Sequence, residues 1–233
     1  MKAVILAAGR GTRMPEITKD IPKCLIEIGG KTILERQIDI LREEGVNDIH
    51  VVVGYMANKV IKRVGDKANL IFNKEYASTD NIYSLYLAEK FVKSKEFILL
   101  NGDVVFDKEI IKDLLKRKEE DIAPIDSQYY DLEELKVRIK DGIIVEILPK
   151  NAPKETSDGS TIGVFKFSSL GSKLLFEEIE KIVEQGIKNK WFEYALNRVL
   201  GKIKMRATDI YGLRWIEIDT LEDIKKARKL FGE

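Results

Sequence analysis

The chain has 233 residues, 44% of them hydrophobic, which is enough to build a sizeable core and excludes a largely disordered protein. Its 40 Lys and Arg residues are balanced by 39 Asp and Glu residues, so no global field favours nucleic acid or an acidic membrane surface. The single cysteine, Cys24, excludes an internal disulfide framework and a cysteine-rich zinc site.

Two further features of the composition indicate where the protein works. Charged residues reach 34%, above the roughly 25% of ordinary domains, and this pattern leans towards a thermophile. The apolar run at residues 3–8 is too short for a signal peptide, and no apolar stretch is long enough to span a bilayer. We therefore expect a cytoplasmic protein without membrane insertion.

Short apolar runs alternate with helical patterns through the first half of the chain. Such alternation is typical of a mostly parallel sheet covered by helices. The predicted strands are residues 3–6, 49–53, 70–72 and 97–100, and the predicted helices include 57–64, 82–91 and 108–116. The clearest helix begins at a capping box of Thr32 and Glu35, has apolar residues at 34, 38 and 41 on one face, and ends at Gly45.

The pattern changes after about residue 121. Two apolar runs, 137–140 and 143–147, flank Asp141-Gly142, which predicts a hairpin and hence an antiparallel addition to the sheet. The later predicted elements are a loop at 151–160, strands at 161–167 and 215–219, helices at 170–185 and 192–200, and a helix from 221 capped by Thr220 and Asp223. With no repeat or low-complexity linker, residues 1–233 are predicted to form one domain.

The first predicted strand continues into a loop of small residues and glycines. Gly9 and Gly11 let backbone N–H groups approach an anion closely, and Arg10 and Arg13 add positive charge, so residues 6–13 form a candidate phosphate-binding loop. Met14 replaces the third glycine of a dinucleotide fingerprint. The alternative is that the glycines only make a tight turn between a strand and a helix.

A second glycine pair, Gly29 and Gly30, could be mistaken for another phosphate-binding loop. Residues 29–32 read Gly-Gly-Lys-Thr, but a P-loop requires a further glycine five residues before Gly30, where this chain has Leu25. These residues are therefore not a P-loop.

The N-terminal residues closely resemble the signature of the sugar-phosphate nucleotidyltransferases. The resemblance rests on residues 1–14, on Ile-Pro-Lys-Cys-Leu at 21–25 and on the glycines at 29–30. Asn-Ile-Tyr-Ser-Leu at 81–85 and Trp-Ile-Glu-Ile-Asp at 215–219 are more similar to the cytidylyltransferases for phosphocholine and inositol-1-phosphate. The resemblance covers nearly the whole chain, strongly to about residue 107 and loosely afterwards.

The resemblance implies a fold and assigns one substrate to each half of the chain. The fold is a Rossmann-like three-layer α/β/α sandwich with a mixed, mostly parallel central sheet and a small antiparallel addition. Residues 1–120 are then the nucleotide-binding half, and residues 121–233 the acceptor-binding half.

The same resemblance assigns the nucleotide site. Arg13 would contact the charged oxygens of the triphosphate, and Lys23 would bridge the triphosphate and the acceptor phosphate, so both are candidate catalytic residues. In isolation Lys23 would be read as an ordinary surface lysine. The candidate nucleotide-binding residues are Leu6, Ala7, Ala8, Gly9, Gly11, Thr12, Arg13, Lys23, Asn81 and Ser84.

Two aspartates are candidate ligands for Mg²⁺. Asp103 follows a predicted parallel strand, at the sheet edge where such folds bind ligands, and Mg²⁺ prefers one or two carboxylates together with phosphate oxygens. The family places its second metal ligand at the position of Asp219, and Glu217 points to the same face. The alternatives are a turn-capping role for Asp103 and a favourable contact of Asp219 with a helix dipole.

The acceptor site is less well defined by the sequence. Its candidate residues are Asp80, Glu193, Tyr194 and Asn197. An aromatic group comprising Trp191, Phe192, Tyr194, Tyr211 and Trp215 is interpreted first as core and edge packing, with an acceptor pocket as the alternative. The only histidine, His50, lies in an apolar strand and is predicted to be packed rather than catalytic.

These residues predict an Mg²⁺-dependent transfer of CMP from CTP to a phosphorylated alcohol, with release of pyrophosphate. The expected acceptor is myo-inositol-1-phosphate, with phosphocholine second. Alternatives are a hexose-1-phosphate uridylyl- or thymidylyltransferase, a molybdopterin-type nucleotide transfer and a non-catalytic nucleotide-binding subunit. The sequence leaves the oligomeric state open, a homodimer being one alternative.

Overall fold

The computed structural model describes residues 1–118, 120–130 and 134–232. Its first half is a parallel sheet in the order β6-β1-β4-β5, formed by β1 (Lys2–Ala7), β4 (Asp48–Val53), β5 (Asn69–Phe72) and β6 (Phe97–Asn101). Residues of β1 alternate between two cores: Ala3 and Ile5 pack on one face, and Val4 packs on the other. Burial on both faces explains why these strands are continuous apolar runs.

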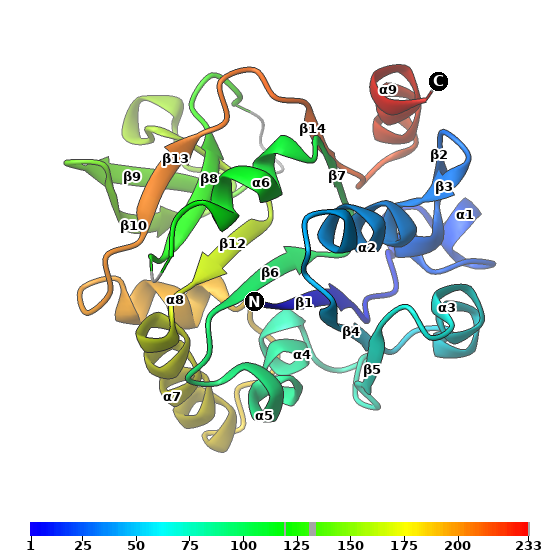
Figure 1. Cartoon of the computed structure of the whole chain (residues 1–233), viewed down its shortest axis with the longest axis horizontal. Helices are drawn as coiled ribbons and strands as arrows, with labels where there is room; N and C mark the ends of the chain where they lie inside the picture. The colour runs from blue at the N-terminus through cyan, green and yellow to red at the C-terminus, as the bar shows by residue number, and fades with distance from the viewer. Residues whose placement is uncertain (119, 131–133, 233) are drawn as a thin grey trace.

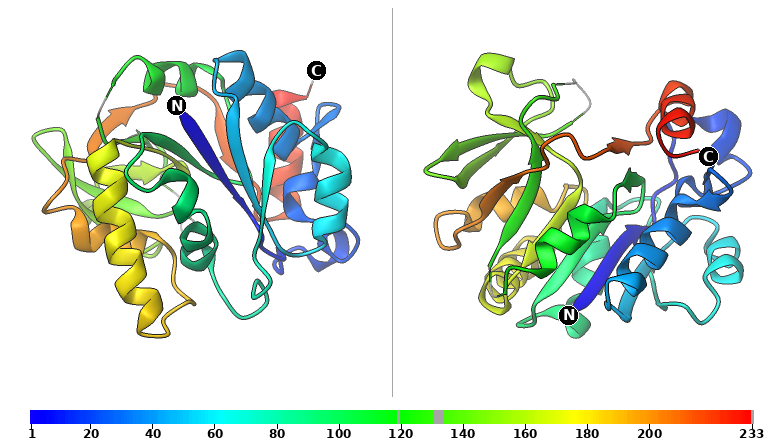
Figure 2. Two further views of the ribbon diagram at one scale, coloured as in Figure 1. Left: turned by 60° about the horizontal axis from the view of Figure 1, so that its bottom comes forward. Right: turned by 45° about the horizontal axis from the view of Figure 1, so that its top comes forward.

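Helices cover both faces of this sheet (Figures 1 and 2). The helices α2 (Ile33–Glu43), α3 (Ala57–Val64) and α6 (Glu109–Leu115) contribute to one core. The other core is formed by α4 (Asn81–Leu87), α5 (Glu89–Val92), α7 (Ser169–Glu184) and α8 (Glu193–Val199). The single helix predicted over 82–91 is divided at Ala88 into α4 and α5.

The second half of the sheet is more antiparallel than the sequence predicted. Strand β12 (Val164–Phe167) runs antiparallel to β6, and β8 (Ile122–Asp126) runs antiparallel to β12. Beyond them lie β13 (Arg206–Asp209), β10 (Ile143–Leu148), β9 (Lys136–Lys140) and β11 (Gly159–Thr161). Because β11 also pairs with β8, these strands close into a ring. The Rossmann-like α/β architecture holds, but the prediction of a mostly parallel sheet with a small addition is wrong beyond β6.

Short elements bring the end of the chain back to its beginning (Figure 1). Strand β14 (Trp215–Glu217) pairs with β7 (Val104–Phe106), and α9 (Leu221–Phe231) shares an apolar core with β2 (Glu27–Ile28). The strand predicted over 215–219 therefore ends at Glu217. The remaining elements are α1 (Pro15–Thr18), β3 (Lys31–Thr32) and the 3-10 helices at Lys23–Leu25 and Lys154–Thr156.

Among the described residues, no helix combines the length and the apolar character that crossing a membrane requires.

The predicted capping box at the start of α2 is present. Glu35 N donates to Thr32 Oγ1 over 3.2 Å, and Thr32 N donates to Glu35 Oε2 over 3.0 Å. We expect Thr32→Ala to lower the free energy of unfolding by about 1 kcal/mol, because the first turn of the helix loses an acceptor. Urea denaturation measures this, and Thr32→Ser, which keeps the hydroxyl, is the control. Equal stability of the alanine and serine variants would contradict the prediction.

Candidate active site

A cavity of about 390 Å³ opens where the Gly-rich loop after β1 meets the turn after β6. Parallel sheets bind ligands at this edge, the carboxyl ends of their strands. Most of the predicted site residues line it, drawn from segments far apart in the sequence: Leu6, Ala7, Ala8, Gly9, Gly11, Thr12, Arg13, Lys23, Asp80, Asn81, Ser84, Asp103, Glu193 and Asp219. Its volume lies in the range of pockets for small molecules.

The Gly-rich loop is held in one shape by its neighbours. Gly11 has φ +62°, and a Cβ there would lie 2.9 Å from Thr18 Cγ2 and 3.2 Å from Lys23 Cβ, so the position requires glycine. Thr18 Oγ1 donates to Gly11 O over 2.9 Å and to Met14 O over 2.8 Å. A Cβ at Gly9, in contrast, would meet no atom within 4 Å. The loop therefore has an open, small-residue face on the cavity, which is suited to an anion.

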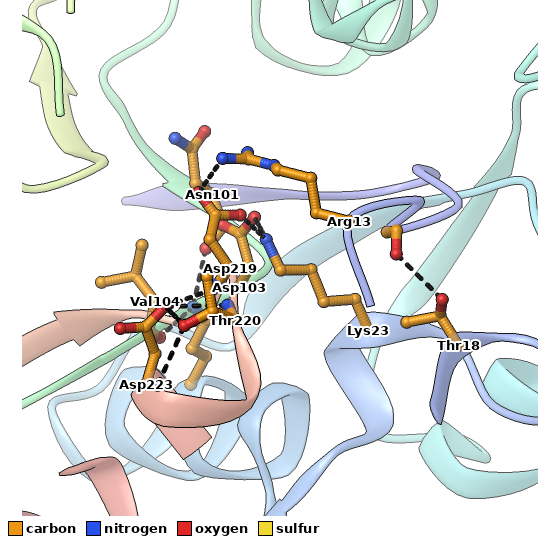
Figure 3. A network of polar contacts seen from close by, with 11 residues as sticks. Arg13, Thr18, Lys23, Asn101, Asp103, Val104, Asp219, Thr220 and Asp223 are labelled. Carbon is orange, nitrogen blue, oxygen red and sulfur yellow. Dashed lines mark hydrogen bonds and ion pairs between the residues drawn. The ribbon is translucent and has the colours of Figure 1, made fainter. Parts of the chain in front are cut away.

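Two predicted cations meet the two predicted metal ligands in one cluster (Figure 3). Lys23 Nζ donates to Asp103 Oδ2 over 2.7 Å and also to Asp219 Oδ1. Arg13 Nη1 lies 2.6 Å from Asp219 Oδ2. The side chain of Lys23 is 12% exposed and that of Asp219 is 5% exposed, so the Lys23–Asp219 pair lies largely out of water.

The burial and charges of this cluster change the proton affinities of its members. Burial alone would lower the pKa of Lys23, but Asp103 and Asp219 raise it well above its ordinary value. Burial would raise the pKa of Asp219, but Lys23 and Arg13 lower it. Lys23 is therefore a fixed positive charge and Asp219 a fixed negative charge at neutral pH.

The pairing of β7 with β14 brings the acidic residues together. Glu217 lies opposite Val104, and Ile218 N donates to Asp103 O over 2.9 Å. Asp103, Glu217 and Asp219 each offer a carboxylate oxygen, and these oxygens lie within 4.8 Å of one another. Such a set of hard oxygen donors suits Mg²⁺. Burial, followed by the charge of Asp103, raises the pKa of Glu217 well above its ordinary value.

The alternative role of Asp219 at the helix dipole finds little support. Thr220 accepts the hydrogen bond from Asp223 N over 3.2 Å, and Asp223 accepts from Thr220 N over 2.8 Å, so these two residues cap α9. The carboxylate of Asp219 is directed at Lys23 and Arg13 instead (Figure 3).

The part of the cavity lining that α8 and the start of α4 contribute carries two further acids, Glu193 and Asp80. Glu193, the first residue of α8, is 6% exposed, and its Oε2 accepts no hydrogen bond from the described residues. Burial raises the pKa of Glu193 to about 8, and the charge of Asp80 adds to the effect. Asn81 Oδ1 accepts a hydrogen bond from Phe192 N over 2.7 Å and so ties the start of α8 to α4. The carboxyl oxygens of this part of the lining can accept hydrogen bonds from a bound molecule.

Two predicted acceptor residues lie outside the cavity lining. The amide of Asn197 pairs with the backbone of Ile147, both over 2.7 Å, and therefore anchors α8 to β10. Tyr194 faces outward and contacts Arg198. Neither of them is placed to contact an acceptor in this arrangement.

The five aromatic residues do not form one pocket. Trp191 lines the cavity, whereas Phe192 is buried against Phe165. Trp215 Nε1 donates to Asp126 Oδ2 over 2.9 Å, and Tyr211 is 86% exposed. Packing, the first interpretation, describes Phe192 and Trp215, and of the five residues only Trp191 lines the cavity.

Sequence reasoning missed several residues of the cavity, three of which bear on acceptor binding. Lys150 lines it, and its Nζ lies 5.4 Å from the ring centre of Trp191. Tyr76 and Glu134 line it as well, and burial raises the pKa of Glu134 to about 7. A lysine after a strand and an acid in a loop are too common to stand out. Lys150 and Glu134 lie next to strands of the ring, and the closure of the sheet brings them to the cavity.

His50 is packed, as predicted. It lies near the amino end of β4, 2.8 Å from Asp48 Oδ1 and with its ring centre 4.4 Å from that of Phe91. It does not line the cavity.

Comparison with protein families gives a match over most of the chain. Residues 3–192 match the model of the MobA-like NTP transferase domain. The chain is 29% identical to the CTP:phosphoglutamine cytidylyltransferase of Campylobacter jejuni, covering 97% of this chain and 98% of that protein. It is 32% identical to the bifunctional IPC transferase and DIPP synthase of Thermococcus kodakarensis, a thermophilic homologue in line with the composition. That match covers 98% of this chain but only 50% of the relative, so the chain spans about half the length of this bifunctional protein.

Solved structures share the fold. The chain matches CTP:phosphocholine cytidylyltransferase from Streptococcus pneumoniae with a TM-score of 0.84 at 24% identity, covering 98% of each chain. It matches the inositol-1-phosphate CTP transferase of T. maritima with a TM-score of 0.80 at 23% identity, covering 99% of this chain and 94% of the other. At these identities the likeness establishes the Rossmann-like nucleotidyltransferase fold alone.

The ion-pair cluster makes Lys23 a structural as well as a chemical residue. We expect Lys23→Met to lower the free energy of unfolding at pH 7 by about 1–3 kcal/mol, because buried carboxylates lose their counter-charge. Lys23 lowers the pKa of the Asp219 carboxyl, so the stability that this contact supplies is present above the ordinary aspartate pKa and is lost as the pH falls below it. The difference between the wild type and the variant should therefore shrink between pH 7 and about pH 3, as the Asp219 carboxyl takes up a proton. Urea denaturation at the two pH values measures this.

A matched control for this variant is available on the surface. Lys31→Met removes an exposed ion pair with Asp39, 2.7 Å long, and should cost far less at both pH values. An equal effect of the two substitutions would show that the cluster does not depend on its central cation.

Proposed function

The chain belongs to the family of MobA-like NTP transferase domains, and on that premise we propose that it transfers CMP from CTP to a phosphorylated small alcohol and releases pyrophosphate. Its relatives named as cytidylyltransferases support CTP as the donor. Residues 1–120 would supply most of the nucleotide site, and residues 121–233 most of the acceptor site.

One observation carries the proposal: Lys23 lies beside the Gly-rich loop and contacts two carboxylates at the carboxyl edge of the sheet. The open face of the loop would receive the triphosphate through its backbone N–H groups. Lys23 and Arg13 would hold the charged oxygens, and their charge would offset that of the departing pyrophosphate. An oxygen of the acceptor phosphate, already ionised at neutral pH, would attack the α-phosphorus in line, so no general base is needed.

The carboxylates Asp103 and Asp219, with Glu217 beside them, would hold Mg²⁺. When bound, the ion would neutralise charge on the triphosphate oxygens. Lys23 Nζ contacts both Asp103 and Asp219, so the cation that would contact the triphosphate lies beside the carboxylates that would hold the ion.

We propose myo-inositol-1-phosphate as the acceptor. Glu193 offers a buried oxygen that accepts no hydrogen bond from the described residues, and Asp80 lies in the same lining, so acceptor hydroxyl groups could donate to both. Since its pKa is about 8, Glu193 is mostly uncharged at neutral pH and would attract a cation weakly. Lys150 would contact the acceptor phosphate. The inositol-1-phosphate CTP transferase named above supports this choice.

Phosphocholine is the second candidate because Trp191 and Tyr76 both line the cavity. Aromatic faces attract quaternary ammonium groups. The similarity to a CTP:phosphocholine cytidylyltransferase favours the same acceptor.

The experiment that tests this function is a grid of CTP, UTP, dTTP, GTP and ATP against phosphorylated alcohols, read by pyrophosphate release. The grid includes hexose-1-phosphates and phosphoglutamine. We expect CTP with myo-inositol-1-phosphate to give the highest kcat/KM. A tenfold higher value for phosphocholine, about 1.4 kcal/mol in transition-state binding, would reverse the order of the two acceptors. A preference for UTP or dTTP with a hexose-1-phosphate would exclude both, and no release from any pair would favour a non-catalytic subunit.

The metal assignment is tested by Asp103→Asn. This change keeps the volume but weakens a metal contact, so we expect activity to fall by orders of magnitude and excess Mg²⁺ to restore part of it, with Asp219→Asn milder or similar. Initial rates are measured across a Mg²⁺ titration. Asp141→Asn, in the exposed hairpin turn at φ +51°, is the control and should be fully active. Full activity of Asp103→Asn at low Mg²⁺ would remove Asp103 from the site.

A further inference from the structure

A buried side chain that does not line the cavity anchors the turn that carries Asp103. Gln37 lies in α2 and is 1% exposed. Its Nε2 donates to Asn101 O and to Val104 O, both over 2.8 Å. The two carbonyl groups stand at either end of the Gly102-Asp103 turn, so one amide group clamps both ends.

The chemistry of this contact explains why glutamine stands here. Both partners are carbonyl oxygens, which only accept, so the amino end of the side chain must face them. Gln37 Oε1 is buried and accepts no hydrogen bond from the described residues. Leaving a buried oxygen without a donor is unfavourable. The amide is therefore present for its two donations, which a hydrocarbon side chain of the same size could not make.

Two backbone hydrogen bonds also hold the Gly102-Asp103 turn in place. Gly102 N donates to Leu6 O over 3.0 Å, and a Cβ at Gly102 would lie 2.6 Å from that oxygen, so the turn is fixed against β1. Asp103 O accepts from Ile218 N, which fixes the turn against the chain that leads to Asp219. Gln37 supplies the third anchor, from the α2 side. With all three in place, the backbone of Asp103 is fixed relative to the chain that leads to Asp219.

We propose that Gln37 is a positioning residue that sets the affinity of the site for a divalent cation by fixing the Asp103 turn. This inference rests on the proposed function, since it takes Asp103 as a metal ligand. Residues that orient metal ligands change metal affinity by about 10- to 100-fold when they are replaced. The effect should appear in metal binding and in the metal dependence of the rate, and much less in the binding of CTP.

The test uses Gln37→Met, which keeps the length of the side chain and removes its donors. Binding of Mn²⁺, measured by the electron paramagnetic resonance signal of the free ion in the presence of CTP, should weaken about tenfold or more. The Mg²⁺ concentration for half-maximal rate should rise in step, while the KM for CTP at saturating Mg²⁺ stays near the wild-type value. Gln37→Asn keeps the amide but is one methylene too short to reach both carbonyls. It should show the same direction of change and serves if the methionine variant does not fold.

The control is Thr32→Ala, which weakens the same helix without touching the turn. It should lower the thermal midpoint and leave Mn²⁺ binding unchanged. Wild-type Mn²⁺ affinity in both Gln37 variants, or an equal loss in Thr32→Ala, would overturn the positioning role while leaving the proposed function intact. Failure of the wild-type protein with CTP to bind Mn²⁺ would overturn the metal site and this inference together.

Discussion

The contact of Lys23 with Asp103 and Asp219 is the constraint on which the rest of the structure depends. It joins three segments separated by 80 and 196 positions in the sequence, and it does so with side chains that are largely buried. Three charges brought so close out of water are tolerable only if each has a partner at hydrogen-bonding distance. The fold must therefore hold the 3-10 helix that begins at Lys23, the turn after β6 and the chain after β14 in fixed relative positions.

The least regular parts of the fold supply that rigidity. The short pairing of β7 with β14 has little core of its own, yet it places Ile218 against Asp103 and turns Asp219 towards Lys23. Helix α9 then packs on the core formed around β2, close to the chain that carries Lys23. Thr18 and Lys23 would both collide with a side chain at Gly11, so the loop can approach them only through glycine. The glycine at position 11 and the pairing of β14 with β7 thus both help to position the Lys23, Asp103 and Asp219 side chains.

The sequence predicts the parts of this molecule that are locally determined. Both capping boxes, the four parallel strands β1, β4, β5 and β6, and the Asp141-Gly142 hairpin follow from apolar spacing and turn chemistry, and the structure has them. Strand β8 contains Pro124, which argues against a strand within a sheet, and β13 has no apolar alternation. Their pairing is set by the ring that they close, which is a tertiary property. For the same reason the sequence does not reveal Gln37 or Lys150. Their contacts arise only when α2 packs on the sheet and the ring closes.

Helix α8 shows why the type of a residue does not by itself place its side chain in a site. The sequence offers both Glu193 and Asn197 as candidate acceptor residues, and they are four residues apart and near one helical face. The structure separates them because the cavity reaches only the first turn of α8, and further along the helix Asn197 meets the backbone of β10. The Gly-rich loop with Arg13 and Lys23, and the acids Asp80 and Glu193, thus line one cavity. Under the proposed function, the loop and its cations would bind the triphosphate that every nucleotide donor shares. The two acids, with Lys150 from the chain after β10, would distinguish one acceptor from another.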